Sequence, residues 1–170
     1  MIVLSNAGPL IALAKLRRLD LLQSLFGKIV VPAPVYHEVV IMGRAQGAAD
    51  ASVAARFLDA VEWRPVTVPS PLLEQQRFQI QLGRGEQAVI ALAMTVEQPL
   101  LLLDDELARI EARRRNLKVK GTLGCIVQAV QQGHLSVDEA DALLHEIADR
   151  TDIWISGSLC QQVLSLIRST

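Results

Sequence analysis

The fold of this chain is decided by residues 82–109, which read LGRGEQAVIALAMTVEQPLLLLDDELAR. Residues 88–94 are apolar on every face of a helix, as expected for a helix that is buried on several sides. After Pro99, four consecutive leucines at 100–103 have the pattern of a central strand in a parallel sheet. Two aspartates and a further helix follow. A buried helix, a buried strand and another helix in succession indicate an α/β protein.

The same alternation extends through the rest of the chain. Strands are expected at 2–5, 28–31 and 118–120, with a weaker edge strand at 62–68. Helices are expected at about 9–16, 19–26, 34–42 (ended by Gly43), 51–60, 72–82, 86–96, 105–115, 121–132, 136–148 and 159–167. This order predicts a three-layer α/β/α sandwich with a central, mostly parallel sheet, plus C-terminal helices. We expect one domain over 1–170, with its core at 1–135 and a helical extension at 136–170.

Composition narrows the classes of function. The chain has 170 residues, of which only 4% are aromatic, so its core must be aliphatic. Its net charge of −1 gives no overall attraction to nucleic acid. Cys125 and Cys160 lack metal-ligand spacing and predict buried, reduced thiols in a cytoplasmic protein. No signal peptide is expected, and no stretch reaches the roughly 18–20 apolar residues of a membrane span.

Oxygen-bearing side chains follow the expected strands or open the helices after them. They are Asn6, Glu38, Glu86, Asp104 and Asp105. The carboxyl ends of parallel strands gather along one edge of a sheet, and ligands bind there. Oxygen ligands without a thiolate or histidine suit a hard cation such as Mg²⁺ or Mn²⁺. Such a cation offsets the repulsion between carboxylates and lowers the pKa of a bound water, which is the chemistry of a metal-dependent phosphodiesterase.

The acids in the central stretch also have structural interpretations. Glu86 could complement the dipole of its helix, although that role does not explain the glycines on both sides of Arg84. Asp104 or Asp105 could be the N-cap of the next helix. Asp105 could also form a surface pair with Arg109, one helical turn away. For these acids, capping and metal binding are compatible, because one aspartate can cap while the other binds.

The two remaining candidates are less distinctive. Glu38 lies at the border of the apolar stripe of its helix, where a rim residue paired with a base is an equally good interpretation. Asn6 offers a neutral amide oxygen. On its own it could be a turn residue that tolerates unusual backbone angles.

Five sequence blocks occur in an order that resembles one known family. They are VLSNAGPLIALAKL (3–16), VPAPVYHEV (31–39), LGRGEQAVIALA (82–93), LLLDDELAR (101–109) and GTLG (121–124). The chain resembles the PIN-domain ribonucleases, and within them the VapC-like, toxin-type group. The resemblance implies a PIN-like fold, Mg²⁺- or Mn²⁺-dependent cleavage of RNA, a homodimer and a cognate antitoxin.

The resemblance also assigns residues. Its four acidic positions fall on Asn6, Glu38, Glu86, and Asp104 or Asp105. Catalytic roles are thereby implied for Glu38, Glu86 and Asp104, and metal ligation for Asn6, Glu86, Asp104 and Asp105. Asn6 stands where the general PIN pattern has aspartate, so weaker metal binding is expected. The rival interpretation is a non-catalytic PIN-like module that binds RNA or a protein.

Contacts to RNA are expected from basic residues that lie close to Asp104 in the sequence. The candidates are Arg109, Arg113 and Lys118. A solvated helix face paired with neighbouring acids is the alternative interpretation. Because aromatic residues are few, recognition of backbone and shape is expected more than base reading. Trp63 and Trp154 are expected in the core or at an interface.

Overall fold

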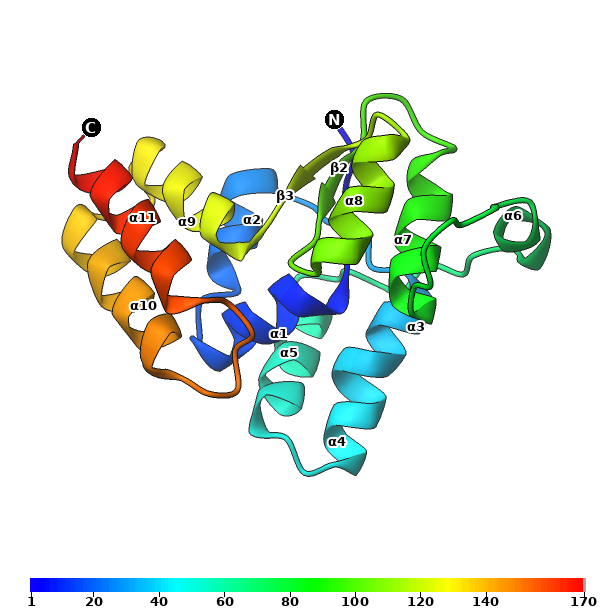
Figure 1. Cartoon of the computed structure of the whole chain (residues 1–170). Coiled ribbons are helices and arrows are strands. Elements are labelled where there is room, and N and C mark those ends of the chain that lie inside the picture. Colours follow the sequence, from blue (N-terminus) through cyan, green and yellow to red (C-terminus); the bar gives the residue numbers. More distant parts are fainter. Residues whose placement is uncertain (170) are drawn as a thin grey trace.

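The computed structural model describes residues 1–169 (Figure 1). Its sheet contains three parallel strands, β1 (Val3–Ser5), β2 (Leu100–Leu102) and β3 (Lys118–Lys120), in the order β1-β2-β3. The buried strand β2 is central, as its leucines predict. Ser5 pairs with Leu102 and Leu102 with Lys120, so the three strands end at the same edge.

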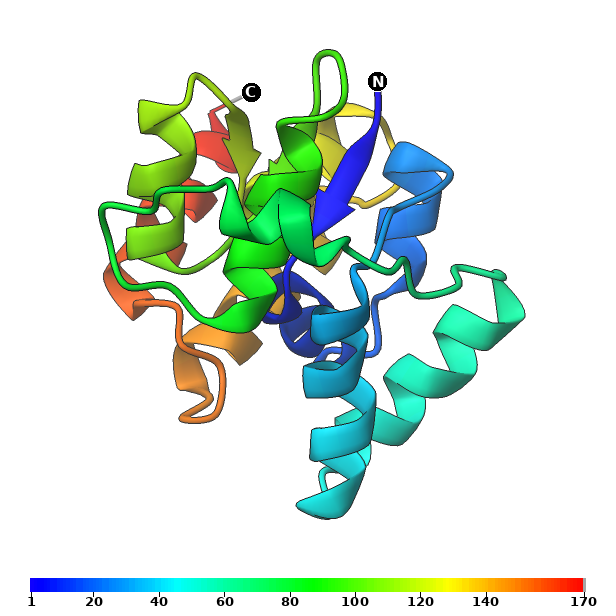
Figure 2. The same ribbon diagram turned by 90° about the vertical axis from the view of Figure 1, so that its right-hand side faces the viewer.

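Helices cover both faces of this sheet. The helices of residues 1–169 are α1 (Ala7–Lys15), α2 (Asp20–Phe26), α3 (Ala33–Tyr36), the π-helix η1 (His37–Met42), α4 (Gly43–Ala45), α5 (Ala49–Ala60), α6 (Ser70–Glu74), α7 (Arg84–Ala93), α8 (Glu106–Arg114), α9 (Thr122–Gln131), α10 (Val137–Asp149) and α11 (Gly157–Arg168). Helices α7 and α8 lie on one face and α2 and α9 on the other (Figures 1 and 2). The predicted α/β/α arrangement is therefore present. Helices α10 and α11 pack against α9.

Two expected strands are reduced to isolated bridges. In the segment 28–31, Val30 bridges to β1, and in the segment 62–68, Val66 bridges to Pro32. Proline has no N–H to donate, so Pro32 stops the first ladder. Both segments extend the edge of the sheet without forming full strands.

The helix expected at 34–42 does not end at Gly43. Helices α3, η1 and α4 follow one another without a break, and the chain turns instead at Gly47, where φ is +73°. A Cβ on Gly43 would lie 2.7 Å from the Cβ of Ala51, so this glycine permits close packing of α5. Glu38 lies in the π-helical turn, a distortion that is frequent at functional sites.

The helix expected at 72–82 is also wrong, because only the short helix α6 forms there. Arg115 holds the segment that follows in an irregular path. Its guanidinium donates to the side chain of Gln76 (2.8 Å) and to the carbonyl of Arg77 (3.0 Å), and lies 4.8 Å from the ring centre of Phe78. One of these contacts uses the carbonyl of Arg77, which a helix continuing through this segment would need for its own hydrogen bonds.

The core is aliphatic, as the composition predicts, with Trp63 buried in it. Cys125 and Cys160 are buried free thiols, and burial raises the pKa of Cys125 to about 12. Trp154, in contrast, is 95% exposed and does not pack in the core. Within residues 1–169, none of the helices has the length and apolar character needed to cross a membrane.

Candidate active site

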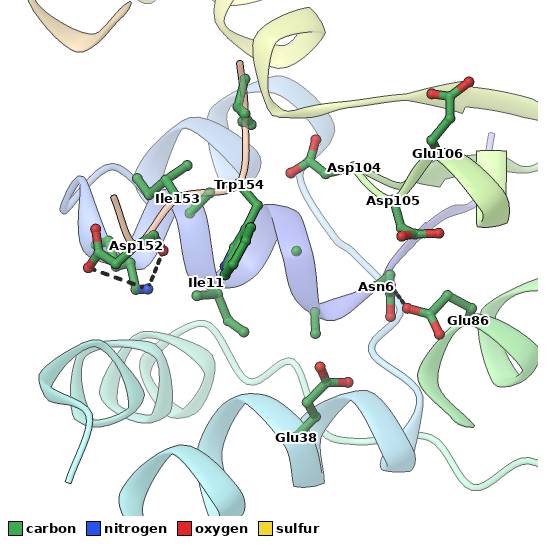
Figure 3. Close-up of a pocket in the computed structure, with 15 residues that line it drawn as sticks. Asn6, Ile11, Glu38, Glu86, Asp104, Asp105, Glu106, Asp152, Ile153 and Trp154 are labelled. Atoms are coloured by element: carbon green, nitrogen blue, oxygen red, sulfur yellow. Dashed lines mark hydrogen bonds and ion pairs between the residues drawn. The ribbon is translucent and has the colours of Figure 1, made fainter. Parts of the chain in front are cut away.

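The candidate oxygen ligands line one pocket at the edge where the strands end. A pocket of about 580 Å³ is lined by Asn6, Glu38, Glu86, Asp104 and Asp105, and also by Glu106 (Figure 3). Among its lining residues only Lys15 is a lysine or arginine. The pocket therefore carries a large excess of negative charge, which favours a cation over an anion.

Asn6 joins the sheet to the pocket. It is 3% exposed, and its backbone N–H donates to the carbonyl of Leu102 (3.0 Å). Its φ and ψ of −81° and 176° are ordinary extended values, so the interpretation as a turn residue with unusual angles is wrong. Although Asn6 is the N-cap of α1, its side chain does not cap that helix. Instead its Nδ2 donates to Oε1 of Glu86 (2.8 Å).

The amide oxygen of Asn6 is buried and has no hydrogen-bond partner within the described residues. This oxygen faces the space that a side chain at position 85 would occupy if Gly85 were a larger residue. A Cβ on Gly85 would lie 2.8 Å from Oδ1 of Asn6 and 3.3 Å from Oε2 of Glu38. Gly85 thus leaves a space at which a neutral oxygen and a carboxylate oxygen converge. A buried acceptor without a partner is costly, so a bound ligand at this place would relieve that cost.

Glu38 reaches the pocket from η1. Glu38 as a whole residue is exposed to solvent, and its carboxylate faces the pocket (Figure 3). Partial burial, and then repulsion by Glu86, raise the pKa of Glu38. Two carboxylates from separate helices therefore interact electrostatically.

Glu86 enters from the first turn of α7. A Cβ on Gly83 would collide with its Oε2, so this glycine makes room for the carboxylate. Gly83 therefore leaves room for the side chain of Glu86, and Gly85 leaves room for those of Asn6 and Glu38. This accounts for the glycines on both sides of Arg84, which a dipole interaction alone left unexplained.

Asp104 is held by Thr122, which follows the neighbouring strand β3 at the same edge of the sheet. The backbone N–H of Thr122 donates to Oδ1 (2.7 Å), and its hydroxyl donates to Oδ2 (2.6 Å). Burial raises the pKa of Asp104, against the opposing effects of the Thr122 hydrogen bonds and the positive charge of Arg109. A Cβ on Gly121 would lie 2.8 Å from Oδ1 of Asp104, so this glycine also clears space for a site oxygen.

Asp105 is the N-cap of α8, because its Oδ1 accepts from the N–H of Ala108 (2.8 Å). The capping interpretation is confirmed. No ion pair joins Asp105 to Arg109 in residues 1–169; Arg109 donates instead to the carbonyl of Leu103 (3.1 Å). Asp105 still lines the pocket, and metal ligation by it stays a prediction.

The residues present fit a hard divalent cation. Every candidate donor is an oxygen, and the partnerless Oδ1 of Asn6 lies where Glu38 also converges. Over residues 1–169, no three His, Cys, Asp or Glu side chains are close enough to hold an ion. Mg²⁺ commonly takes one or two carboxylates, keeps several waters and accepts carbonyl oxygens.

The expected RNA-binding residues do not lie together. Arg109 lies beside Asp104. Arg113 and Lys118 are exposed and line a different pocket with Met1, near the edge where the strands begin. RNA contact by these residues stays a prediction. Arg113 and Lys118 lie at the end of the sheet where the strands begin, whereas the carboxylates lie at the end where the strands finish.

Sequence reasoning assigned no role to Thr122 or to the wall formed by residues 152–155. Thr122 lies in the GTLG block just after β3, so the rule that ligands gather beyond strand ends could have identified it. Residues 152–155 precede α11 and come near the pocket only through tertiary packing. No local pattern predicts their position.

Glu38→Gln should raise the melting temperature near neutral pH without divalent ions. The pKa of Glu38 is higher in the folded protein than in the unfolded chain, so its ionised form destabilises the fold. This destabilisation is complete above the folded pKa and disappears below the unfolded pKa of about 4.3, where the carboxyl is protonated in both states. We expect a gain of about 2 °C at neutral pH, because solvent screens this carboxylate. Melting in EDTA at neutral pH and at about pH 3.5 measures it, with the exposed Glu97→Gln as control. Equal gains at both pH values would contradict the assignment.

Comparison with known proteins agrees with this geometry. A family model described as a PIN domain matches residues 2–169. No curated protein and no solved structure gives a significant match. PIN domains are typically nucleases and generally use divalent metal ions. Because the match spans nearly the whole sequence and the sheet and helices have the corresponding α/β arrangement, the chain belongs to the PIN-domain family.

Proposed function

We propose that this protein is a metal-dependent endoribonuclease of the toxin type. The observation that carries the proposal is the convergence of Asn6, Glu38, Glu86 and Asp104 in one acidic pocket of a PIN domain. The sequence blocks that resemble toxin-type members support RNA as the substrate. They also support the further proposals of a homodimer and a cognate antitoxin.

Each side chain has a role in this proposal. Glu38, with its raised pKa, is suited to accept a proton at its carboxylate from the water that attacks phosphorus. Nδ2 of Asn6 orients Glu86, and Thr122 orients Asp104. Asn6, Glu86 and Asp104 would hold Mg²⁺ or Mn²⁺, which neutralises phosphoryl charge and lowers the pKa of a bound water.

A non-catalytic PIN-like module is the second candidate. It is favoured by Asn6, which gives the pocket one negative charge fewer than the aspartate of the general PIN pattern. Metal-dependent activity and metal affinity separate the two candidates.

The proposal is tested by incubating single-stranded RNA with the protein and Mn²⁺ or Mg²⁺. Cleavage should require the metal, and Glu86→Gln should lower its rate by about 100-fold or more, as expected for loss of a charged catalytic group. Glu97→Gln removes the same charge outside the pocket and should cleave normally. If no metal stimulates cleavage, the ribonuclease proposal fails. If Glu86→Gln cleaves as fast as the unmodified protein, cleavage does not depend on Glu86 and the assignment of the active site to this pocket fails.

Asn6→Asp should strengthen Mg²⁺ binding while weakening the metal-free fold. The new carboxylate adds charge next to the ion but loses the hydrogen bond to Glu86 and repels it. We expect roughly tenfold tighter binding, which requires only ~1.4 kcal/mol. Calorimetry gives the affinity and melting in EDTA the stability, with the exposed Asn116→Asp as control. Weaker or unchanged Mg²⁺ binding would count against Asn6 as a ligand.

Gly85→Ala should impair metal binding without unfolding the protein. Its Cβ would press on Oδ1 of Asn6 and Oε2 of Glu38, whereas alanine itself favours a helix over glycine. We expect Mg²⁺ affinity to fall about 10- to 100-fold, the usual range for disturbed metal surroundings. Gly157→Ala is the control, because its Cβ would meet only Ala148 at 3.8 Å. Unaltered Mg²⁺ binding by Gly85→Ala, measured by calorimetry, would place the ion elsewhere.

A further inference from the structure

Trp154 is an exposed indole at the edge of the acidic pocket. It is 95% exposed, and it is the only exposed Phe, Tyr or Trp side chain in residues 1–169. It lines the same pocket as Glu38 and Asp104, on the side away from Asn6 and Glu86 (Figure 3). A large aromatic ring in water forgoes the gain of burial, so this position calls for a physical explanation.

The exposure of Trp154 does not come from a loosely held loop, because the residues before it are anchored. Ile153 is buried in the core. Lys15 donates to the carbonyl of Asp152 (2.6 Å), and Arg150 donates to both oxygens of its carboxylate (2.8 and 2.9 Å). Hydrogen bonding by Arg150 accordingly lowers the pKa of Asp152. The ring is therefore presented to solvent by a fixed segment.

The pocket continues on the far side of Glu38. A second cavity of about 700 Å³ shares Glu38 as a wall and is lined also by His37, Arg84 and Gly85. Arg84 is exposed and, within the described residues, makes no ion pair and no side-chain hydrogen bond. An unpaired guanidinium thus lies on one side of Glu38 and an exposed indole on the other.

These two groups match the two parts of a nucleotide chain. Base stacking on an aromatic ring works for every base and requires single-stranded nucleic acid. A guanidinium binds phosphate by charge-assisted hydrogen bonds. A protein partner could also cover Trp154, but it would not account for the path through Glu38 to a free guanidinium.

We propose that single-stranded RNA crosses the site over Glu38, with one base stacked on the indole of Trp154 and a backbone phosphate at Arg84. The inference rests on the proposed ribonuclease function and adds to it the residues that hold the substrate. It places the RNA track at the carboxylate edge of the sheet.

The test measures binding of a short fluorescein-labelled single-stranded RNA by anisotropy, in Ca²⁺ to slow hydrolysis. Trp154→Ala should weaken binding roughly 5- to 150-fold, and Trp154→Phe should largely restore it. RNA should quench the tryptophan emission of the unmodified protein but not that of Trp154→Phe, in which only Trp63 emits. Leu159→Ala, another exposed apolar side chain, is the control for truncation.

Arg84 is tested in parallel by its salt dependence. Arg84→Gln should flatten the slope of affinity against salt concentration by about one counterion, whereas Arg56→Gln, an exposed arginine outside the pocket, should not. An unchanged slope for Arg84→Gln would remove the phosphate contact from the proposed track.

The outcomes distinguish the two proposals. If Trp154→Ala binds RNA as tightly as the unmodified protein while metal-dependent cleavage persists, the stacking inference is overturned and the nuclease proposal stands. Trp154 would then be left as a contact for a protein partner. If the unmodified protein neither binds nor cleaves RNA, both proposals fail together.

Discussion

Two backbone hydrogen bonds just beyond the ends of the strands continue the parallel pairing of the sheet. The candidate site depends on them. The N–H of Asn6 donates to Leu102 (3.0 Å), and the N–H of Leu103 donates to β3 (2.9 Å). The side chains that follow the strands, including Asp104 and Thr122, are therefore brought to one edge. A shift of one residue between β2 and β3 would separate Asp104 from Thr122 and break their two hydrogen bonds, so the register of the sheet sets the position of the site.

Glycine makes the gathering of acids sterically possible. At Gly83, Gly85 and Gly121 a Cβ would press on an oxygen of the pocket. Steric room does not remove the electrostatic cost, and the raised pKa values of Glu38 and Asp104 both reflect burial of a carboxyl group. A divalent cation would reverse this cost, which connects the shape of the pocket to the metal dependence that is general in the family.

The same negative charge constrains how a polyanion could approach. Carboxylates repel phosphate, so RNA would need the cation and a nearby source of attraction. Arg113 and Lys118 lie at the other edge of the sheet, whereas Arg84 and Trp154 flank Glu38. The proximity of basic residues to Asp104 in sequence was therefore a poor guide to proximity in space, because helix α8 carries the chain away from the site and Lys118 stands at the start of the strand that returns to it.

The sequence by itself determined the central strand, the helices around it and the oxygen donors, since burial of residues 88–94 and 100–103 leaves a parallel sheet as the solution and makes its strand ends converge. The structure also contains a capping box at Ser136 and Glu139, a local feature whose residues lie three positions apart in the chain. Only the tertiary structure decided the positions of Arg115, Thr122 and Trp154. Each depends on contacts between segments distant in the chain, and such contacts leave no periodic pattern in a single sequence.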